Sequence, residues 1–334
     1  MYALQMDAPA PDASTTRVIR TEQPSPGPGQ VAIDVGYAGV NFMDVMTRRG
    51  DPGYAPTGWP LVPGLEVAGT VRSLGPGVSG LTVGDRVATL VAGGGFAQVA
   101  VADARLVAPV PDGLDLSIAA AAPLMLSTAV LLLRDAAQLR PGERLFMHAA
   151  SGGVGSVVPQ VAQVLGSGVR VGTVARAASI DTALAAGWDQ ILPQDTDLRA
   201  AALTASADGG FDVILDPTGT TALDIDLDLA APGARIVLFG NATGTAPAPL
   251  PPFARLLGGN LGLIGFSMSA LRQTRPSRVA DALSTALAML AGGQVHPPIT
   301  IVESLEHVGD IHDLLANRAG TGKYVVRLDD TPAA

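Results

Sequence analysis

A glycine-rich turn is the stretch of this sequence whose residue types most clearly suit a chemical task. The apolar run Leu145-Phe-Met-His148 leads into Ala149-Ala-Ser-Gly-Gly-Val-Gly155, and an apolar-periodic segment follows at once. The spacing Ala150-x-Gly152-x-x-Gly155 matches the dinucleotide fingerprint G-x-G-x-x-G, with alanine at the first glycine. A strand, turn and helix in this order present backbone N–H groups and a helix N-terminus to a pyrophosphate. The predicted contacts are Ser151, Gly152, Gly153, Val154 and Gly155.

Further candidate contacts follow the other apolar runs. The second run ends Val174-Ala-Arg176, with no acid until Asp181. An acid near this point holds a ribose diol, whereas a guanidinium matches a 2′-phosphate. Arg176 therefore favours NADPH over NADH, unless it is an ordinary solvated charge. Two later runs end in polar or glycine-containing segments that either contact the cofactor or simply complete tight turns. The candidates there are Thr218, Phe239, Gly240 and Asn241.

Composition narrows the class of protein. The chain has 334 residues, 48% hydrophobic and 15% charged, which is typical of a globular chain with two domains. A net charge of −9 with scattered basic residues argues against nucleic-acid binding. The absence of cysteine excludes disulfides, thiolate chemistry and Cys-ligated zinc.

The sequence pattern predicts a cytoplasmic protein without membrane association. The first residues show neither a basic region nor a long apolar stretch of the kind found in signal peptides. The longest apolar run, 118–133, is short for a membrane span and contains Pro123, so we predict a buried helix.

The spacing of apolar runs predicts an α/β chain with two architectures. Runs at 30–40, 66–74, 84–88 and 96–101 are separated by turns, which is typical of an antiparallel, partly open β-barrel. Later strands near Leu145, Val169, Ile191, Val213 and Ile236 alternate with helical patterns near Val154, Ala177, Leu198 and Thr221, as in a doubly wound parallel sheet. A sixth run, 261–266, extends the edge of that sheet. Helices at 277–290 and 304–315 and a strand at 323–328 return to the first domain. The predicted domains are 1–124, completed by 267–334, and 125–266.

Several ordered motifs together resemble one known family. They are Asn41-Phe-Met-Asp44, Arg49-Gly50, Pro63-Gly-Leu-Glu-Val-Ala-Gly69, Gly84-Asp-Arg-Val87, the glycine turn and Gly322-Lys323. Their order resembles the medium-chain dehydrogenase/reductase superfamily, in its zinc-independent quinone oxidoreductase-like branch. The resemblance implies a GroES-like catalytic domain, a Rossmann domain that binds NADPH, and a homodimer. We expect the edge strand 261–266 to form the dimer contact.

The departures from zinc-dependent relatives predict a protein without a metal. Asn41 stands where those enzymes carry a cysteine, and Gly64-Leu65-Glu66 replaces their Gly-His-Glu. The four histidines, at 148, 296, 307 and 312, show no metal-ligand spacing. Without a Lewis acid, hydride addition to a conjugated acceptor is easier than alcohol oxidation, because hydrogen-bond donors suffice to stabilise the developing oxyanion.

The predicted function is NADPH-dependent reduction of a quinone or an α,β-unsaturated carbonyl compound, a small apolar acceptor. Two alternatives stay open: an enoyl-thioester reductase of fatty-acid or polyketide type, and a non-catalytic NADPH-binding sensor or structural protein. The acceptor pocket is predicted to involve apolar side chains that also suit a plain core. They are Met43, Met46, Trp59, Phe96 and Phe266.

Three residues are the catalytic candidates. Asn41 contacts either the substrate oxygen or the nicotinamide ribose, or else caps the loop before Asp44. Thr128 resembles the family's threonine near the nicotinamide, or is a plain helix hydroxyl. Tyr54 resembles the proton donor of some enoyl reductases, although it lies two residues further from Gly50 than usual.

The remaining cofactor candidates come from the resemblance and from position. Ser179 and Gln194 occupy positions where relatives often carry lysine and tyrosine, and Phe266 ends the sixth run. Lys323, the only lysine, either reaches the cofactor or substrate, or is a strand-edge charge.

Overall fold

The computed structural model of the chain describes residues 1–194, 197–246 and 249–328, and its contacts divide it into two units. Unit 1 comprises Met1–Ser127, Leu271–Gly293 and Pro297–Ala334. Unit 2 comprises Thr128–Ala270 and Gln294–His296. The chain therefore builds most of unit 2 in one excursion from unit 1, and returns to unit 2 only for the short segment Gln294–His296 before it completes unit 1.

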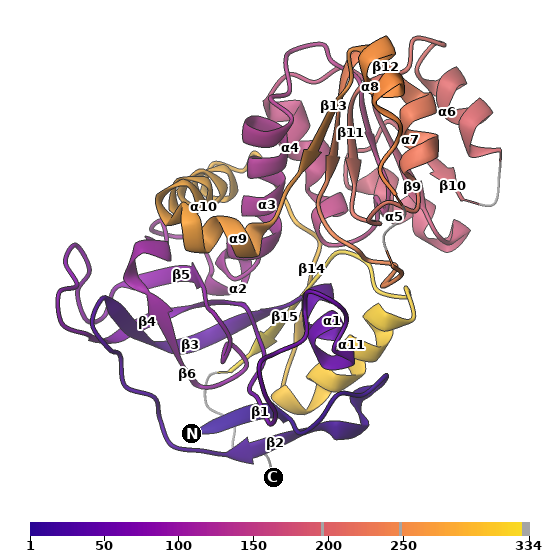
Figure 1. The fold of residues 1–334 in the computed structure, drawn as a ribbon. Helices are drawn as coiled ribbons and strands as arrows, with labels where there is room; N and C mark the ends of the chain where they lie inside the picture. Colours follow the sequence, from indigo (N-terminus) through magenta and orange to yellow (C-terminus); the bar gives the residue numbers. More distant parts are fainter. Residues whose placement is uncertain (195–196, 247–248, 329–334) are drawn as a thin grey trace. The chain divides into compact units, whose positions relative to one another are not determined.

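Unit 1 is built on a sheet in the order β14-β15-β3-β4-β5-β7, with β6 also pairing with β3 (Figure 1). All pairings are antiparallel except β14 with β15. A separate antiparallel pair is formed by β1 and β2. The strands are β1 (Tyr2–Met6), β2 (Thr16–Arg20), β3 (Gln30–Val40), β4 (Glu66–Leu74), β5 (Arg86–Leu90), β6 (Val99–Asp103), β7 (Val107–Pro109), β14 (Ile299–Val302) and β15 (Lys323–Arg327). The antiparallel arrangement predicted from the turn-separated runs and the GroES-like domain implied by the family resemblance are both confirmed.

The helices of unit 1 follow their sequence signals closely. Helix α10 has proline in its first turn and two glycines after its end, and it buries an apolar stripe that includes Leu283 and Leu287. Helix α11 packs against α1, which brings residues near 44 and 312 together. The helices are α1 (Phe42–Arg49), α2 (Leu116–Ala119), α9 (Met268–Thr274, which begins in unit 2), α10 (Pro276–Ala291) and α11 (Val308–Ala316), with single turns η1 (Ala13–Thr15), η2 (Ala104–Leu106) and η7 (Leu305–His307).

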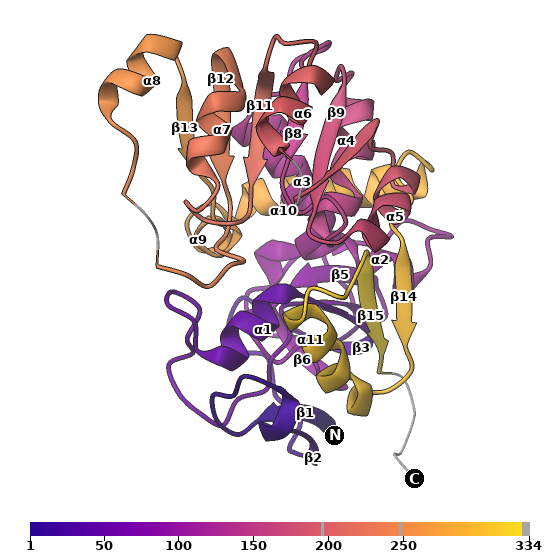
Figure 2. The ribbon, with the colours of Figure 1, turned by 90° about the vertical axis from the view of Figure 1, so that its right-hand side faces the viewer.

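Unit 2 is a parallel sheet in the order β10-β9-β8-β11-β12-β13, flanked by helices (Figures 1 and 2). This is the Rossmann strand order, and it confirms the doubly wound parallel sheet predicted from the alternating pattern. Because all strands run the same way, their carboxyl ends meet at one edge. The strands are β8 (Leu145–Met147), β9 (Arg170–Val174), β10 (Gln190–Pro193), β11 (Phe211–Asp216), β12 (Ala230–Leu238) and β13 (Gly262–Gly265). The helices are α3 (Ser127–Val130, which starts at the last residue of unit 1), α4 (Val158–Val164), α5 (Ile180–Ala185), α6 (Leu198–Ala205), α7 (Leu223–Leu229) and α8 (Phe253–Gly259), with turns η5 (Val154–Ser156) and η6 (Ala177–Ser179).

Two predicted elements begin later than expected. The helix expected from Val154 starts with a 3₁₀ turn, and regular α4 begins only at Val158, with Pro159 in its first turn. Proline is accepted there because the first N–H groups of a helix lack internal partners. The strand expected over 96–101 begins at Val99, since the backbone of Phe96 instead pairs with Leu4.

The long apolar run is helical but not one regular helix. It passes from α2 through the π-helical turn η3 (Ala122–Leu126) and α3 to a second π-helical turn, η4 (Leu131–Ala136). Pro123 cannot donate the helical hydrogen bond, which accounts for an irregular turn at this point. Among the described residues this stretch, Leu116–Ala136, is the one helix long and apolar enough to cross a membrane, but 83% of its most apolar window is buried inside the protein.

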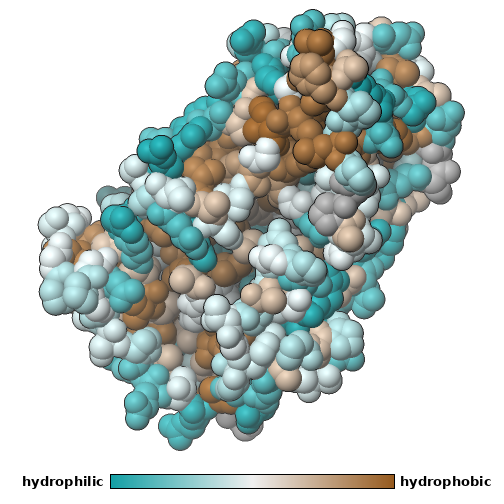
Figure 3. All heavy atoms as spheres, viewed as in Figure 1, coloured by the Kyte–Doolittle hydropathy of each residue, from teal (hydrophilic) through white to brown (hydrophobic). Residues whose placement is uncertain are grey.

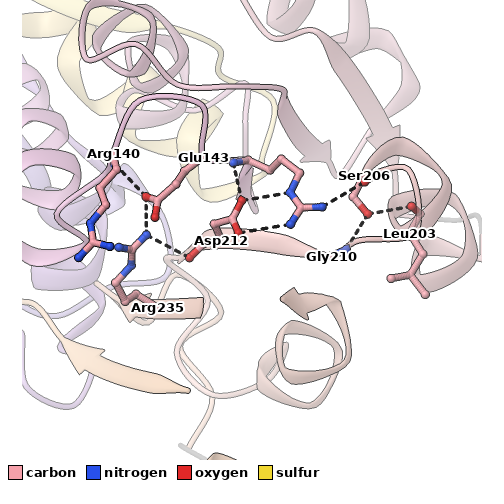
Figure 4. A network of polar contacts seen from close by, with 8 residues as sticks. Arg140, Glu143, Leu203, Ser206, Gly210, Asp212 and Arg235 are labelled. Carbon is pink, nitrogen blue, oxygen red and sulfur yellow. Dashed lines mark hydrogen bonds and ion pairs between the residues drawn. The ribbon is translucent and has the colours of Figure 1, made fainter. Parts of the chain in front are cut away.

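A polar network secures the edge of the parallel sheet opposite the carboxyl ends (Figure 4). The Arg144 guanidinium, just before β8, donates to Asp212 on β11, with Nε 3.0 Å from Oδ2. Arg235 on β12 donates to Glu143 at 2.5 Å and also contacts the Asp212 carbonyl. These ion pairs join the starts of three strands, so they stabilise the sheet and leave the other edge available for ligands.

Candidate functional site

The glycine turn after β8 is tight because its packing leaves no room for a side chain at Gly155. A Cβ on Gly155 would lie 2.5 Å from the Ala149 carbonyl oxygen and 2.6 Å from that of Ala150. A Cβ on Gly172 of β9 would lie 2.5 Å from the Ala150 methyl group, so the neighbouring strand must also carry glycine. The Trp188 indole N–H donates to the Gly155 carbonyl at 2.9 Å and fixes the end of the turn.

The same turn offers unpaired donors. Within the described part of the chain, the backbone N–H groups of Ser151, Gly153 and Val154 have no hydrogen-bond acceptor. Such a set of amides at the start of a helical segment attracts an anion. The turn therefore suits the pyrophosphate of a dinucleotide.

The other predicted cofactor residues of unit 2 meet the turn at the carboxyl edge of the sheet. Backbone bonds join neighbouring strand ends: the Gln194 N–H donates to Val174, and that of Phe266 donates to Leu238. Residues that lie 115 positions apart in the sequence, Ser151 and Phe266, thus belong to one edge. The predicted residues at this edge are Ser151, Gly152, Gly153, Val154, Gly155, Arg176, Ser179, Gln194, Thr218, Phe239, Gly240, Asn241 and Phe266.

Arg176 and Ser179 differ in accessibility. Arg176 precedes the turn η6 and is exposed, whereas the Ser179 side chain is 5% exposed. A bulky, solvated phosphate requires an accessible partner, which the exposed Arg176 side chain offers and the buried Ser179 side chain does not.

A second constellation lies inside unit 1 and joins three segments distant in sequence. The Lys323 ammonium contacts Glu66 Oε1, donates to Asn41 Oδ1 at 2.6 Å, and donates to the Val40 carbonyl at 3.0 Å. Lys323 and Glu66 are 2% and 0% exposed. The Leu124 N–H donates to the other Glu66 oxygen at 2.7 Å. The carboxylate and the ammonium thus satisfy each other within the core.

This arrangement corrects two expectations. Both donors of the Asn41 amide are used, with Nδ2 2.9 Å from Glu66 Oε1 and 3.1 Å from the Gly39 carbonyl. Asn41 therefore does not donate to a substrate oxygen; its Oδ1 keeps one lone pair and can only accept. Lys323 is neither a cofactor ligand nor a strand-edge charge, because its amino group is buried and bound by three oxygens.

Asp44 and His312 form a buried pair beside this constellation. Asp44 accepts the Asn41 N–H at 2.8 Å, which pins the loop before α1. His312 Nε2 lies 3.9 Å from Asp44 Oδ2, and both side chains are almost fully buried. Burial raises the pKa of Asp44 to about 7, although the nearby Lys323 charge opposes the shift. Burial and the Arg48 charge lower the pKa of His312 to about 3, so this imidazole is neutral.

Asp44 should therefore make folding stability depend on pH. Its folded pKa is raised above the unfolded value, so its contribution is complete below about pH 4 and is lost as pH rises through 7. Asp44 makes the free energy of unfolding fall as pH rises from 4 to 7. We expect Asp44→Asn to make this slope less negative, by up to roughly 1.4 kcal/mol per pH unit. Urea unfolding at several pH values measures this. The exposed Asp112→Asn should leave the slope unchanged, and an equal slope in both variants would contradict the assignment.

The remaining predicted residues are placed separately. Tyr54 follows α1 in a half-buried position, and burial together with the Asp51 charge raises the pKa of its phenol. Thr128 on α3 lies between the two π-helical turns, and its hydroxyl finds no hydrogen-bond partner among the described residues. Met46 and Phe96 are buried core residues, which corrects their expected place on the rim of an acceptor pocket.

Family models match both units of the chain. Residues 27–112 match the alcohol dehydrogenase GroES-like domain, and residues 153–286 match a domain described as zinc-binding dehydrogenase. The chain is also 36% identical over 227 residues to 2-haloacrylate reductase from Burkholderia sp., covering 66% of this chain and 68% of that protein. The chain belongs to the medium-chain dehydrogenase/reductase superfamily, in its zinc-independent quinone oxidoreductase-like branch. The chain is therefore a member of a family of oxidoreductases.

Solved structures and longer relatives agree with this membership. Mycobacterial Rv1454c in complex with NADPH superposes with a TM-score of 0.87 at 29% identity, covering 98% of this chain and 99% of that one. The quinone oxidoreductase of Pseudomonas syringae pv. tomato DC3000 gives 0.88 at 26% identity, covering 98% and 99%. The polyketide synthase component PikAII of Streptomyces venezuelae is 35% identical over 313 residues, or 92% of this chain. This chain spans 8% of that protein's length, and between 4% and 15% of the first four polyketide synthases it matches.

The residues of this reductase-family chain do not fit the zinc ion that one domain description implies. Asn41 and Leu65 supply neither a thiolate nor an imidazole, and the Lys323 ammonium lies against Asn41 and Glu66. A dication beside that ammonium would be repelled, and Zn²⁺ prefers sulfur and nitrogen ligands. Across residues 1–194, 197–246 and 249–328, no group of three His, Cys, Asp or Glu side chains is placed to hold a metal.

Sequence reasoning missed three buried acids: Glu66 beside Lys323, and Asp216 and Asp226 near His148. Glu66 was noted only as part of a motif, and its bond to Lys323 spans 257 positions with no local signal. Asp226 lies on α7 between two other aspartates, and nothing in that alternating pattern distinguishes it. Asp216 closes β11, and its place just before Pro217-Thr-Gly219 was the available signal.

Proposed function

We propose that the chain is an NADPH-dependent reductase that transfers hydride to a quinone or an α,β-unsaturated carbonyl compound. Its relatives include a structure titled as a complex with NADPH, a quinone oxidoreductase and a 2-haloacrylate reductase. A haloacrylate is itself an α,β-unsaturated acid, which supports a conjugated acceptor. The proposed site of action is cytoplasmic, and the proposed acceptor is small and apolar.

The observation that carries the nucleotide assignment is the glycine turn with its unpaired amides. Ser151, Gly153 and Val154 point to a pyrophosphate, and the exposed Arg176 stands where an acid would otherwise hold a ribose diol. Guanidinium and phosphate pair through two parallel hydrogen bonds, which distinguishes NADPH from NADH.

The proposed roles of the chain's own residues are to bind and orient the cofactor and the acceptor, and one residue holds a proton. When bound, the cofactor supplies the hydride. Asn41 keeps an acceptor lone pair, so its proposed partner is a ribose hydroxyl. Like any phenol, Tyr54 keeps its proton at neutral pH, and burial with the Asp51 charge raises its pKa further, so it is the proposed proton donor to the reduced acceptor. Thr128 retains a hydroxyl available for a nicotinamide contact.

An enoyl-thioester reductase is the second candidate, favoured by the extended matches to polyketide synthases. Turnover of a panel of quinones, enones and enoyl-thioesters, followed as NADPH oxidation at fixed protein concentration, decides between them. Faster turnover of thioesters would select the second candidate. Tight NADPH binding without turnover of any acceptor would contradict both and indicate a sensor or structural protein.

Arg176→Ala should weaken the binding of NADPH but not that of NADH. We expect KM for NADPH to rise about tenfold, which equals the loss of roughly 1.4 kcal/mol of phosphate contact, while KM for NADH stays constant. Steady-state kinetics with both cofactors measures the ratio. Arg105→Ala removes an arginine whose side chain is 67% exposed in unit 1 and should change neither value. Equal losses for both cofactors in Arg176→Ala would contradict the phosphate role.

We also propose a homodimer through the edge of the parallel sheet. Strand β13 pairs only with β12 among the described strands, and apolar side chains gather over β13 and α8 (Figure 3). On and just before α8, Leu250, Phe253 and Leu257 are 66%, 75% and 62% exposed. A second copy would cover both the open strand edge and this apolar surface.

Phe253→Asp should dissociate that dimer. We expect light scattering after size exclusion to give twice the chain mass for the natural protein and one chain mass for the variant, since a charge would be buried in the interface. Leu184→Asp, at a 40% exposed position on α5, should remain dimeric. A monomeric natural protein at micromolar concentration would contradict the proposal.

A further inference from the structure

A buried polar cluster lies directly behind the glycine turn, inside unit 2. His148, the residue that follows β8, places Nε2 2.8 Å from Asp226 Oδ1 on α7 and Nδ1 3.3 Å from the Thr173 hydroxyl on β9. Asp216 closes β11 beside them. His148 is 2% exposed, and Thr173, Asp216 and Asp226 are 0% exposed. We call these four side chains the His148 cluster.

The His148 cluster contains more negative charge than its hydrogen bonds satisfy. Within the described residues, Asp216 Oδ2 and Asp226 Oδ2 have no hydrogen-bond partner. One imidazolium faces two carboxylates, and β9 contributes only the uncharged Thr173. On the side of β8, Phe146 presents its ring edge-on to His148, with centroids 5.0 Å apart. The other acids of α7, Asp224 and Asp228, instead pair with Arg255.

The titration of the cluster follows from this imbalance. Burial and the charge of Asp226 raise the pKa of Asp216 to about 6. Burial by itself lowers the pKa of His148, but the hydrogen bond and charge of Asp226 outweigh it and raise that pKa. The group of the cluster that exchanges a proton near pH 6 is therefore Asp216.

Asp216 also anchors the turn that follows β11. Its Oδ1 accepts the Thr218 N–H at 2.6 Å, and the Thr218 carbonyl accepts the Thr243 hydroxyl at 3.2 Å. Gly219 has φ of 91° and fits against Asn241, since a Cβ would lie 2.9 Å from its Oδ1. The turns after β11 and β12 are thus held together through Thr218. A carboxylate accepts the anchoring bond more strongly than a neutral carboxyl group does.

We propose that Asp216 is a positioning residue whose ionised form fixes the Thr218–Gly219 turn for the nucleotide, so that NADPH binding drives a proton off the His148 cluster. The inference rests on the nucleotide site proposed above. It adds a proton to the binding equilibrium: the carboxyl O–H bond of Asp216 breaks, the electron pair stays on the carboxylate, and the proton goes to buffer.

Calorimetric titration with NADPH at pH 6, in buffers of different ionisation enthalpy, counts that proton. At a pH equal to the pKa a carboxyl group is half protonated, so we expect the natural protein to release up to about 0.5 proton more than Asp216→Asn. The phosphates of NADPH contribute equally to both and cancel in the difference. Asp224→Asn, on the same helix as Asp226 but 94% exposed, should match the natural protein.

Equal proton counts for the natural protein and Asp216→Asn would overturn the inference and leave the proposed reductase intact. A natural protein that binds no NADPH would overturn both.

Should Asp216→Asn not fold, histidine NMR of the natural protein gives the same test. The His148 ring is recognised by its contact with Phe146. Its resonances should report a titration step near pH 6 that moves to lower pH on saturation with NADPH. A step that does not move would overturn the inference.

Discussion

Lys323→Met is expected to destabilise the fold by about 3–5 kcal/mol, the usual loss when one partner of a buried ion pair is removed. The ammonium bonds Glu66, Asn41 and the Val40 carbonyl, so its loss leaves the Glu66 carboxylate buried against methionine. Gly39 allows this contact, since a Cβ there would lie 2.6 Å from Glu66 Cδ. Urea unfolding monitored by circular dichroism measures the change.

A second substitution separates charge from packing. In Lys323→Met combined with Glu66→Gln neither position carries a charge, so we expect the double variant to regain about half or more of the lost stability. Arg72→Met, which breaks the exposed pair with Asp34, should cost at most about 1 kcal/mol. If Lys323→Met proves as stable as Arg72→Met, the structural role of Lys323 is contradicted.

The strands and the turn were predictable from sequence because their signals are local. The alternation of apolar runs with helical patterns determines the parallel sheet, and the missing side chains of Gly152 and Gly155 define the turn. The predicted elements of unit 2 therefore agree with β8 to β13 to within a few residues. The exceptions are at Pro123 and Pro159, where proline changes helix geometry in a way that apolar periodicity does not register.

The buried polar groups were not predictable because their partners are distant in sequence. Asn41 reads as a ligand-binding amide until Lys323 and Glu66 are placed beside it, 282 and 25 positions away. His148 is joined to Asp226 across 78 positions. Spacing along one segment indicates which face of a helix or strand a residue occupies. It does not indicate which residues from distant segments pack against that face. For this reason the sequence did not show that the Asn41 amide donors and the Lys323 ammonium are already bound inside the protein.

Gly155→Ala is expected to abolish tight NADPH binding. The new Cβ would lie 2.5 to 2.7 Å from backbone atoms of Ala149 and Ala150, and backbone atoms cannot move aside as a flexible side chain does. The turn must open, at a cost of about 1–3 kcal/mol, and the amides of Ser151 and Gly153 then lose their common direction. We expect Kd for NADPH to rise more than tenfold, with a lower melting temperature, measured by calorimetry and thermal unfolding.

Gly152→Ala is the matched control within the same turn, because it separates packing from ligand approach. Its Cβ would lie 3.4 Å from the Ala149 carbonyl oxygen and meet no other atom within 4 Å, so the melting temperature should stay unchanged. In the dinucleotide fingerprint this glycine lets the backbone approach the pyrophosphate, whereas the last one permits close packing of the turn. Gly152→Ala should therefore weaken NADPH binding without loss of stability. If it instead binds NADPH as tightly as the natural protein does, the pyrophosphate does not lie against this turn, and the nucleotide site is wrong.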